Sequence, residues 1–167
     1  MTGTIRNIII LLGLAASLAF FNLQIKSAQA IKDDGDILLL QLRPVDPREI
    51  MMGDFMALAY DQQAFPDEIE EDLVPSGSVI LDLDDNNVGV FARFDDGSAL
   101  GNNQMRLNYI RLFNENLEYG GKRYYFQEGT ARVFEAAQYG VFKVDKSGRA
   151  ILSDMADENF NILSALE

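Results

Sequence analysis

The stretch SVILDLDDNNVGVFARF, residues 78–94, sets the pattern for most of the chain. Two apolar runs, residues 78–83 and 88–94, flank Asp84-Asp85-Asn86-Asn87, whose side chains are all common turn formers. Apolar runs separated by a short polar turn are typical of a β-hairpin. A second turn, Asp95-Asp96-Gly97, follows directly. The sequence therefore predicts an antiparallel meander in this region.

Similar β patterns continue on both sides of the hairpin, and helical patterns are few. The other predicted strands are residues 37–42, 55–60, 105–113, 122–127, 141–144 and 149–152, the last two forming a closing hairpin. The predicted helical segments are residues 130–139, one turn at 46–52, a short helix or loop at 66–72 and a terminal turn within 154–167. We expect a mainly β (α+β) fold, with one compact antiparallel β-rich domain and one or two short helices.

The composition removes several classes of chemistry. The chain has 167 residues and contains no cysteine and no histidine. Thiolate nucleophiles, Ser-His-Asp triads, disulfides, iron–sulfur clusters and nearly all zinc sites need one of these residue types. The sequence therefore assigns no catalytic residue, no metal site and no cofactor.

Acidic residues dominate the chain after its N-terminal segment. The first acidic residue is Asp33, and residues 33–167 contain 26 acidic and 11 basic side chains, a net charge of −15. Such a surface repels phosphate backbones, and no basic stripe with interleaved aromatic residues offsets it. We therefore expect no nucleic-acid partner.

The N-terminal segment has the length and polarity of a membrane span. Residues 7–25 are 19 consecutive uncharged residues, and as a helix they cover ~28 Å, just enough to cross a bilayer. Ala28-Gln29-Ala30 also has the small-x-small form of a signal-peptidase site, which would release a soluble protein beginning at Ile31. The apolar run exceeds the usual signal-peptide core of about 7 to 15 residues, so a retained anchor is favoured over cleavage.

The charges around this span predict its orientation. Arg6 and the free amine precede it unopposed, whereas Lys26 and Lys32 stand beside the acidic residues that follow them. The positive-inside rule then places the N-terminus in the cytoplasm and the C-terminal domain in the periplasm or outside the cell. This divides the chain into a cytoplasmic tip and signal-anchor helix at residues 1–30 and an extracytoplasmic β-rich domain at residues 31–167.

Residues 53–60, Gly-Asp-Phe-Met-Ala-Leu-Ala-Tyr, resemble the signature string of the GDYXXLXY family, with Phe55 where the string has tyrosine. Residues 44–48, 125–129 and 135–140 are similar to further blocks of that family. The resemblance implies a bacterial inner-membrane protein with a retained anchor, from a family that has no established activity. Its members are often encoded near polytopic membrane proteins. We therefore expect such a protein as the partner, besides the lipid bilayer through residues 7–25.

Two positions depart from the family pattern. Phe55 lacks the phenol hydroxyl, so the residue at this position is not an acid, a base or a nucleophile in this chain, and a packing role is favoured. Gln138 stands where the family commonly has arginine, which argues against an anion-binding role built on that position.

The candidate interaction residues belong to the family-like strings or lie beside them. They are Asp46, Arg48, Gly53, Asp54, Phe55, Leu58, Tyr60, Gln127, Glu128, Gly129, Glu135 and Tyr139. For Gly53-Asp54 a turn is the simpler interpretation, since glycine accepts a positive φ and aspartate accepts backbone N–H bonds. Glu128 is explained more simply as an acid at a helix entry.

Three functions are compatible with these patterns. The leading hypothesis is a non-enzymatic, single-pass membrane protein whose extracytoplasmic domain docks on another membrane protein. One alternative is a carboxylate-dependent envelope hydrolase that uses Asp54, Glu128 and Glu135. The other is a module that binds a small ligand or a cation, with the net charge of residues 33–167 favouring a cation.

Overall fold

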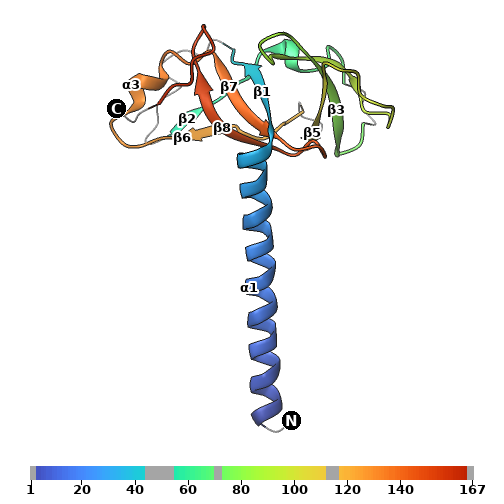
Figure 1. Cartoon of the computed structure of the whole chain (residues 1–167), viewed down its shortest axis with the longest axis vertical. Coiled ribbons are helices and arrows are strands. Elements are labelled where there is room, and N and C mark those ends of the chain that lie inside the picture. The colour runs from blue at the N-terminus through green and yellow to red at the C-terminus, as the bar shows by residue number, and fades with distance from the viewer. Residues whose placement is uncertain (1–2, 44–54, 70–72, 112–116, 165–167) are drawn as a thin grey trace.

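The computed structural model describes residues 3–43, 55–69, 73–111 and 117–164 of the chain. The helical turn predicted at residues 46–52 lies outside these ranges, as do residues 70–72 and the end of the strand predicted at 105–113. Figure 1 shows one long helix that projects from a domain made mostly of strands, with the N-terminus at the far end of the helix.

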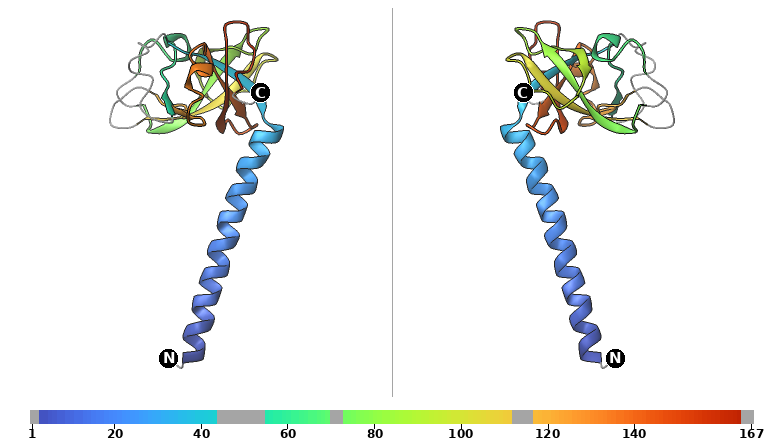
Figure 2. Two further views of the ribbon diagram at one scale, coloured as in Figure 1. Left: turned by 90° about the vertical axis from the view of Figure 1, so that its left-hand side faces the viewer. Right: turned by 90° about the vertical axis from the view of Figure 1, so that its right-hand side faces the viewer.

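Helix α1 (Gly3–Asp34) is a single uninterrupted helix, seen from two further sides in Figure 2. Its apolar side chains are exposed rather than packed against the domain. The part from Asn7 to Asp34 is long and apolar enough to cross a membrane. A helix meets its own backbone hydrogen-bonding needs, as lipid requires. The predicted N-terminal apolar helix is confirmed, and it continues to Asp34, beyond the predicted span of 7–25.

The first sheet follows the helix and has the antiparallel order β1–β7–β8. Its strands are β1 (Asp36–Gln41), β7 (Tyr139–Val144) and β8 (Ala150–Ala156). The strand predicted at 37–42 and the closing hairpin are confirmed, and both hairpin strands extend further than expected. The Asp145 carboxylate closes the hairpin turn by accepting N–H bonds from Ser147 and Arg149.

The second sheet has the order β4–β3–β5. Its strands are β3 (Ser76–Leu83), β4 (Gly89–Phe94) and β5 (Gln104–Ile110). The hairpin predicted at residues 78–94 is confirmed. The meander prediction is wrong, because β5 pairs with β3 and not with β4. Val79, Ile80 and Leu81 of β3 are fully buried, and a strand that is apolar on both faces belongs in the middle of a sheet.

A third, two-stranded sheet pairs β2 (Phe55–Ala57) with β6 (Arg123–Tyr125). Both strands are shorter than the predicted ranges 55–60 and 122–127. After β2 the chain forms an isolated bridge between Tyr60 and Leu42, and then the 3-10 helix η1 (Gln62–Ala64). Residues 66–69 of the predicted acidic helix or loop are not helical.

Near the C-terminus one helix prediction is confirmed only in part and another is wrong. Helix α3 (Ala131–Phe134) covers four residues of the predicted 130–139, because the chain after it joins the first sheet. There the Leu42 N–H donates to the Gln138 carbonyl, and Tyr139 begins β7. The segment from residue 154 continues as β8 to Ala156 and then turns at Asp157 rather than forming a helical turn. In both places tertiary pairing overrides local helical spacing.

The main hydrophobic core is shared by the two three-stranded sheets. Its fully or almost fully buried side chains include Leu38, Leu40, Val79, Leu81, Leu107, Tyr109, Phe142 and Val144. A parallel bridge between Leu39 and Val88 connects the two sheets. The expected fold class is confirmed: an apolar N-terminal helix precedes a β-rich domain of three small antiparallel sheets with few helices.

Helix α1 meets the first sheet without a linker. Ile31, in its last turn, is only 5% exposed. The Gly35 N–H donates to the Ile31 carbonyl at 2.9 Å, and the Gly35 carbonyl accepts from Lys143 Nζ at 3.1 Å. A Cβ at position 35 would lie 2.4 Å from the Ile31 oxygen and 3.0 Å from the Val144 nitrogen, so a larger residue requires the backbone to shift. Glycine therefore lets α1 end directly against β7.

We expect Gly35→Ala to destabilise this junction, because the added methyl group meets backbone atoms and overpacking typically costs about 1–3 kcal/mol. Gly101→Ala is the matched control, since a Cβ there meets only Gln104 atoms at 3.5 Å. Thermal unfolding of the full chain in lipid nanodiscs, followed by near-UV circular dichroism, compares the two variants. Equal melting temperatures would contradict the tight junction.

Candidate binding site

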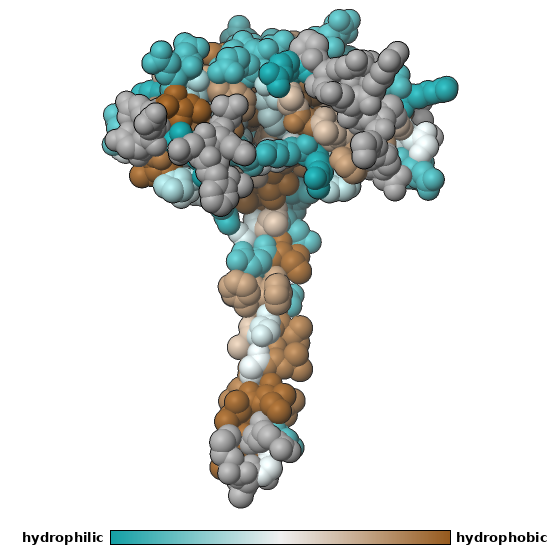
Figure 3. Space-filling view, turned by 180° about the vertical axis from the view of Figure 1, so that it is seen from behind, coloured by the Kyte–Doolittle hydropathy of each residue, from teal (hydrophilic) through white to brown (hydrophobic). Residues whose placement is uncertain are grey.

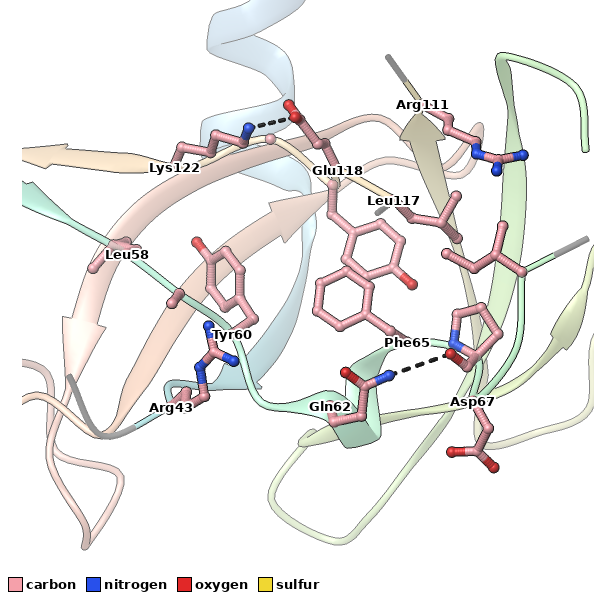
Figure 4. A pocket seen from close by; sticks show the side chains of 15 residues that line it. Arg43, Leu58, Tyr60, Gln62, Phe65, Asp67, Arg111, Leu117, Glu118 and Lys122 are labelled. Atoms are coloured by element: carbon pink, nitrogen blue, oxygen red, sulfur yellow. Dashed lines mark hydrogen bonds and ion pairs between the residues drawn. The ribbon is translucent and has the colours of Figure 1, made fainter. Parts of the chain in front are cut away.

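A pocket of about 380 Å³ lies beside Leu58 and Tyr60, two residues of the family-like string (Figure 4). One wall is formed by residues 58–69, on either side of η1, and the other by residues 117–122, which precede β6. Arg43, after β1, and Arg111, after β5, complete the described lining. The pocket therefore forms where four separate segments of the chain converge.

Main-chain bonds to the end of β1 hold the first wall in place. Tyr60 pairs with Leu42, and the Asp61 N–H donates to the Gln41 carbonyl at 2.8 Å. The Asp61 carboxylate then caps η1 by accepting from the Gln63 N–H at 3.1 Å. This capped turn places Phe65 on the pocket wall next to Tyr60.

The two tyrosine hydroxyls of the pocket are used by the fold. Tyr60 donates to the Gly121 carbonyl at 2.6 Å, and Tyr119 donates to the Ala64 carbonyl at 2.7 Å. Gly121 adopts a φ of +64°, a conformation that favours glycine. Burial raises the pKa of both phenols, so each stays neutral at physiological pH. They serve as structural donors rather than as acid–base groups.

Aromatic and aliphatic side chains supply much of the wall. The Phe65 and Tyr119 rings are stacked, with centroids 4.8 Å apart and planes 6° from parallel. Leu58, Ile69 and Leu117 line the same pocket. These side chains offer an apolar group of a ligand a surface to pack against.

Charged side chains stand around these apolar groups. Lys122 forms an ion pair with Glu118. Arg111 is 8% exposed and is the buried charged residue of the described domain. Arg43 is exposed. Asp67 is the second acidic residue of the lining, besides Glu118. Basic residues thus outnumber acidic ones in this lining.

The described lining contains few side chains that are free to react. No serine or threonine belongs to the described lining, and one of its two carboxylates is ion-paired with Lys122. Within the parts of the chain that the structure describes, no group of three or more acidic side chains is placed to hold a metal ion.

The structure separates the candidate residues predicted from sequence. Leu58 and Tyr60 line the pocket. Phe55 lies on β2, where its ring is 5.7 Å from that of Tyr125 and the Arg123 guanidinium carbon is 5.2 Å from its centroid. Asp46, Arg48, Gly53 and Asp54 lie outside the described residues.

The second family-like block lies away from the pocket lining. Gln127, Glu128 and Gly129 form an exposed loop after β6, and Glu135 is exposed directly after α3. Tyr139 begins β7 and packs on Phe160, with ring centroids 5.0 Å apart. The blocks meet outside the pocket instead, because Phe55 pairs with Tyr125 across β2 and β6.

Sequence reasoning missed the basic residues of the pocket. Arg43, Arg111 and Lys122 come from distant segments, so no spacing connects them. The scarcity of basic side chains is the one signal that points to them, because residues 33–167 contain only 11.

A protein-family model matches most of the chain. The family model described as GDYXXLXY protein matches residues 17–155, from within α1 to within β8, and so confirms the resemblance noted from the sequence. No curated protein and no solved structure matches the chain.

We expect Tyr60→Phe to destabilise the domain by about 1 kcal/mol, because it leaves the Gly121 carbonyl without its partner in a partly buried setting. Tyr125→Phe is the control: its side chain is 66% exposed, and a surface change of this kind stays within about 0.5 kcal/mol. Denaturant unfolding of the full chain in nanodiscs measures both values. A Tyr60→Phe variant as stable as the control would show that the bond contributes little.

Proposed function

The chain belongs to the GDYXXLXY family, and from this premise we propose that it is a single-pass protein of the bacterial inner membrane whose extracytoplasmic β-rich domain docks on another membrane protein. In this role the domain binds and does not catalyse a reaction. The observation that carries the proposal is the linker-free junction, where Ile31, which is buried, and the closely packed Gly35 hold the domain against the end of a helix long enough to span a membrane.

The junction also supports retention of the helix after export. Cleavage after Ala30 would cut α1 directly before Ile31, whose side chain is 5% exposed. It would place a new charged amino group beside a buried position, which is unfavourable. The family match begins at residue 17, so the second half of the apolar helix belongs to the family pattern. Both observations favour an anchor over a signal peptide.

Polar groups on α1 support a partner inside the membrane. Asn22 and Gln24 carry amides within the predicted span, and the Asn22 amide donates to the Leu18 carbonyl at 2.9 Å. The side chains of this span are exposed, so α1 does not bury these amides against the domain. Such amides stabilise contacts between membrane helices because lipid offers them no partner.

The domain surface supports a lateral contact close to the bilayer. A domain fixed to the helix end keeps one height above the membrane, within reach of neighbours in the same bilayer. Figure 3 shows apolar residues along the helix, at its junction with the domain and at the domain edges, among hydrophilic ones. Tyr125 and Ile162 are exposed large apolar residues of the domain, at 66% and 53%. A polytopic membrane protein fits both the helix and this surface.

The hydrolase alternative has no supporting geometry in the described residues. Glu128 and Glu135 are exposed and do not line the pocket, and Asp54 lies outside those residues. A retaining or inverting glycosidase needs two carboxylates facing each other across the substrate.

We expect cell fractionation to recover a C-terminally tagged chain in the membrane, beginning at its own N-terminus and digested by protease only from the outer side of spheroplasts. The reason is that α1 is both long enough to span and coupled to the domain. A soluble product beginning at Ile31 would contradict the proposal.

The docking itself is tested with a photo-cross-linking amino acid in place of Gln24 or Tyr125. We expect a discrete covalent adduct with one polytopic membrane protein, identified by mass spectrometry. The matched control places the same amino acid at Asn86, an exposed turn residue of the β3–β4 hairpin. Adducts with lipid alone, or the same adduct from the control position, would exclude a specific partner.

A further inference from the structure

The pocket lining reverses the charge balance of the domain around it. Residues 33–167 contain 26 acidic and 11 basic side chains. The described lining has three basic residues, Arg43, Arg111 and Lys122, against two acidic ones. A local excess of positive charge in a domain of net charge −15 is a point at which an anion is favoured.

Arg43 is the cation that this pocket offers to a ligand. Its main-chain N–H donates to the Ala59 carbonyl at 2.8 Å, which fixes its position beside Tyr60. The side chain is exposed, and no ion pair or side-chain hydrogen bond involves it among the described residues. Figure 4 shows its guanidinium beside Tyr60. A free guanidinium fork binds a carboxylate with two parallel hydrogen bonds.

The acidic residues of the lining leave Arg43 available. Glu118 is held by Lys122 at the opposite side of the pocket (Figure 4). The Asp67 side chain lies on the far side of Gln62 from Arg43 in the same view. The Gln62 amide is itself engaged, since it donates to the Pro66 carbonyl at 3.3 Å.

The aromatic and aliphatic side chains of the lining determine which kind of group fits beside the carboxylate of the ligand. The hydroxyls of Tyr60 and Tyr119 are consumed by main-chain carbonyls, so these residues contribute ring surface rather than donors. The stacked Phe65 adds a further ring, and Leu58 adds aliphatic surface. One free charge beside aromatic and aliphatic side chains matches a ligand with one acidic group and one apolar group.

We propose that this pocket binds a small molecule that has one carboxylate, held by Arg43, and a compact apolar body, packed against Phe65 and Leu58. The volume of about 380 Å³ lies at the lower end of the range for small-molecule sites. This binding does not depend on the docking function, because it requires neither a partner protein nor the exposed face of α1.

The test uses 4-fluorophenylacetate as the probe and fluorine NMR of the full chain in phosphatidylcholine nanodiscs. We expect saturable line broadening that empty nanodiscs do not produce. The neutral 4-fluorophenylacetamide has nearly the same shape and lacks the charge, so we expect it to bind at least about tenfold more weakly.

Variants then assign the carboxylate contact. Arg43→Glu should weaken probe binding by about tenfold or more, the effect of losing a charge-assisted hydrogen bond. Arg132→Glu makes the same charge change on α3, at an exposed position that does not line the pocket, and should leave binding unchanged. Arg43→Gln removes the positive charge without adding a negative one, and it should also weaken probe binding. Near-UV circular dichroism confirms that each variant is folded.

Three results would overturn the proposal. The first is the absence of saturable broadening with the wild-type chain. The second is equal binding of the acid and the amide, which would remove the role of the charge. The third is equal weakening by Arg43→Glu and Arg132→Glu, which would reduce the effect to the overall charge of the domain.

Discussion

The pairing of β1 with β7 is the interaction on which the rest of the structure depends. Strand β1 begins two residues after α1 ends, and its antiparallel partner comes from the other end of the chain. The pairing buries Leu38, Leu40 and Phe142 completely. Leu39 adds a bridge to Val88, which connects the second sheet to the same strand. One strand therefore joins the apolar helix α1, both larger sheets and the main core.

The pocket depends on the end of that same strand. Gln41 and Leu42 hold Asp61 and Tyr60 through main-chain pairing, and Arg43 follows them. The opposite wall is fixed to this one by the bond from the Tyr60 hydroxyl to the Gly121 carbonyl. The pocket and the helix junction thus lie at the two ends of β1. Loss of the β1–β7 pairing would disturb both at once, which is why variants aimed at the pocket must leave this pairing intact.

Features that depend on neighbouring residues were predicted correctly from the sequence, whereas features that depend on residues far apart in the chain were not. The hairpins at residues 78–94 and around residues 145–148 were predictable because turn residues such as Asp84 and Asp145 act on their own neighbours. Strand β5 could pair with the free edge of β3 or with that of β4, and the spacing of apolar residues does not indicate which edge it joins. The helix predicted at 130–139 is confirmed only at Ala131–Phe134, because Tyr139 and Gly140 pair with β1, about a hundred residues earlier. The pocket cations were missed for the same reason, since only the folded chain brings them together.

The two aromatic residues of the family string, at positions 55 and 60, have different structural roles. At position 55 the ring packs against Tyr125 and under the Arg123 guanidinium, and neither contact uses a hydroxyl. At position 60 the hydroxyl makes the 2.6 Å bond that joins the two walls of the pocket. A phenylalanine is therefore compatible with the first aromatic position of the string, whereas the second requires the phenol. Because Leu58 and Tyr60 both line the pocket, the end of the string is the part that shapes this binding site, and its first aromatic residue supports the small sheet beside it.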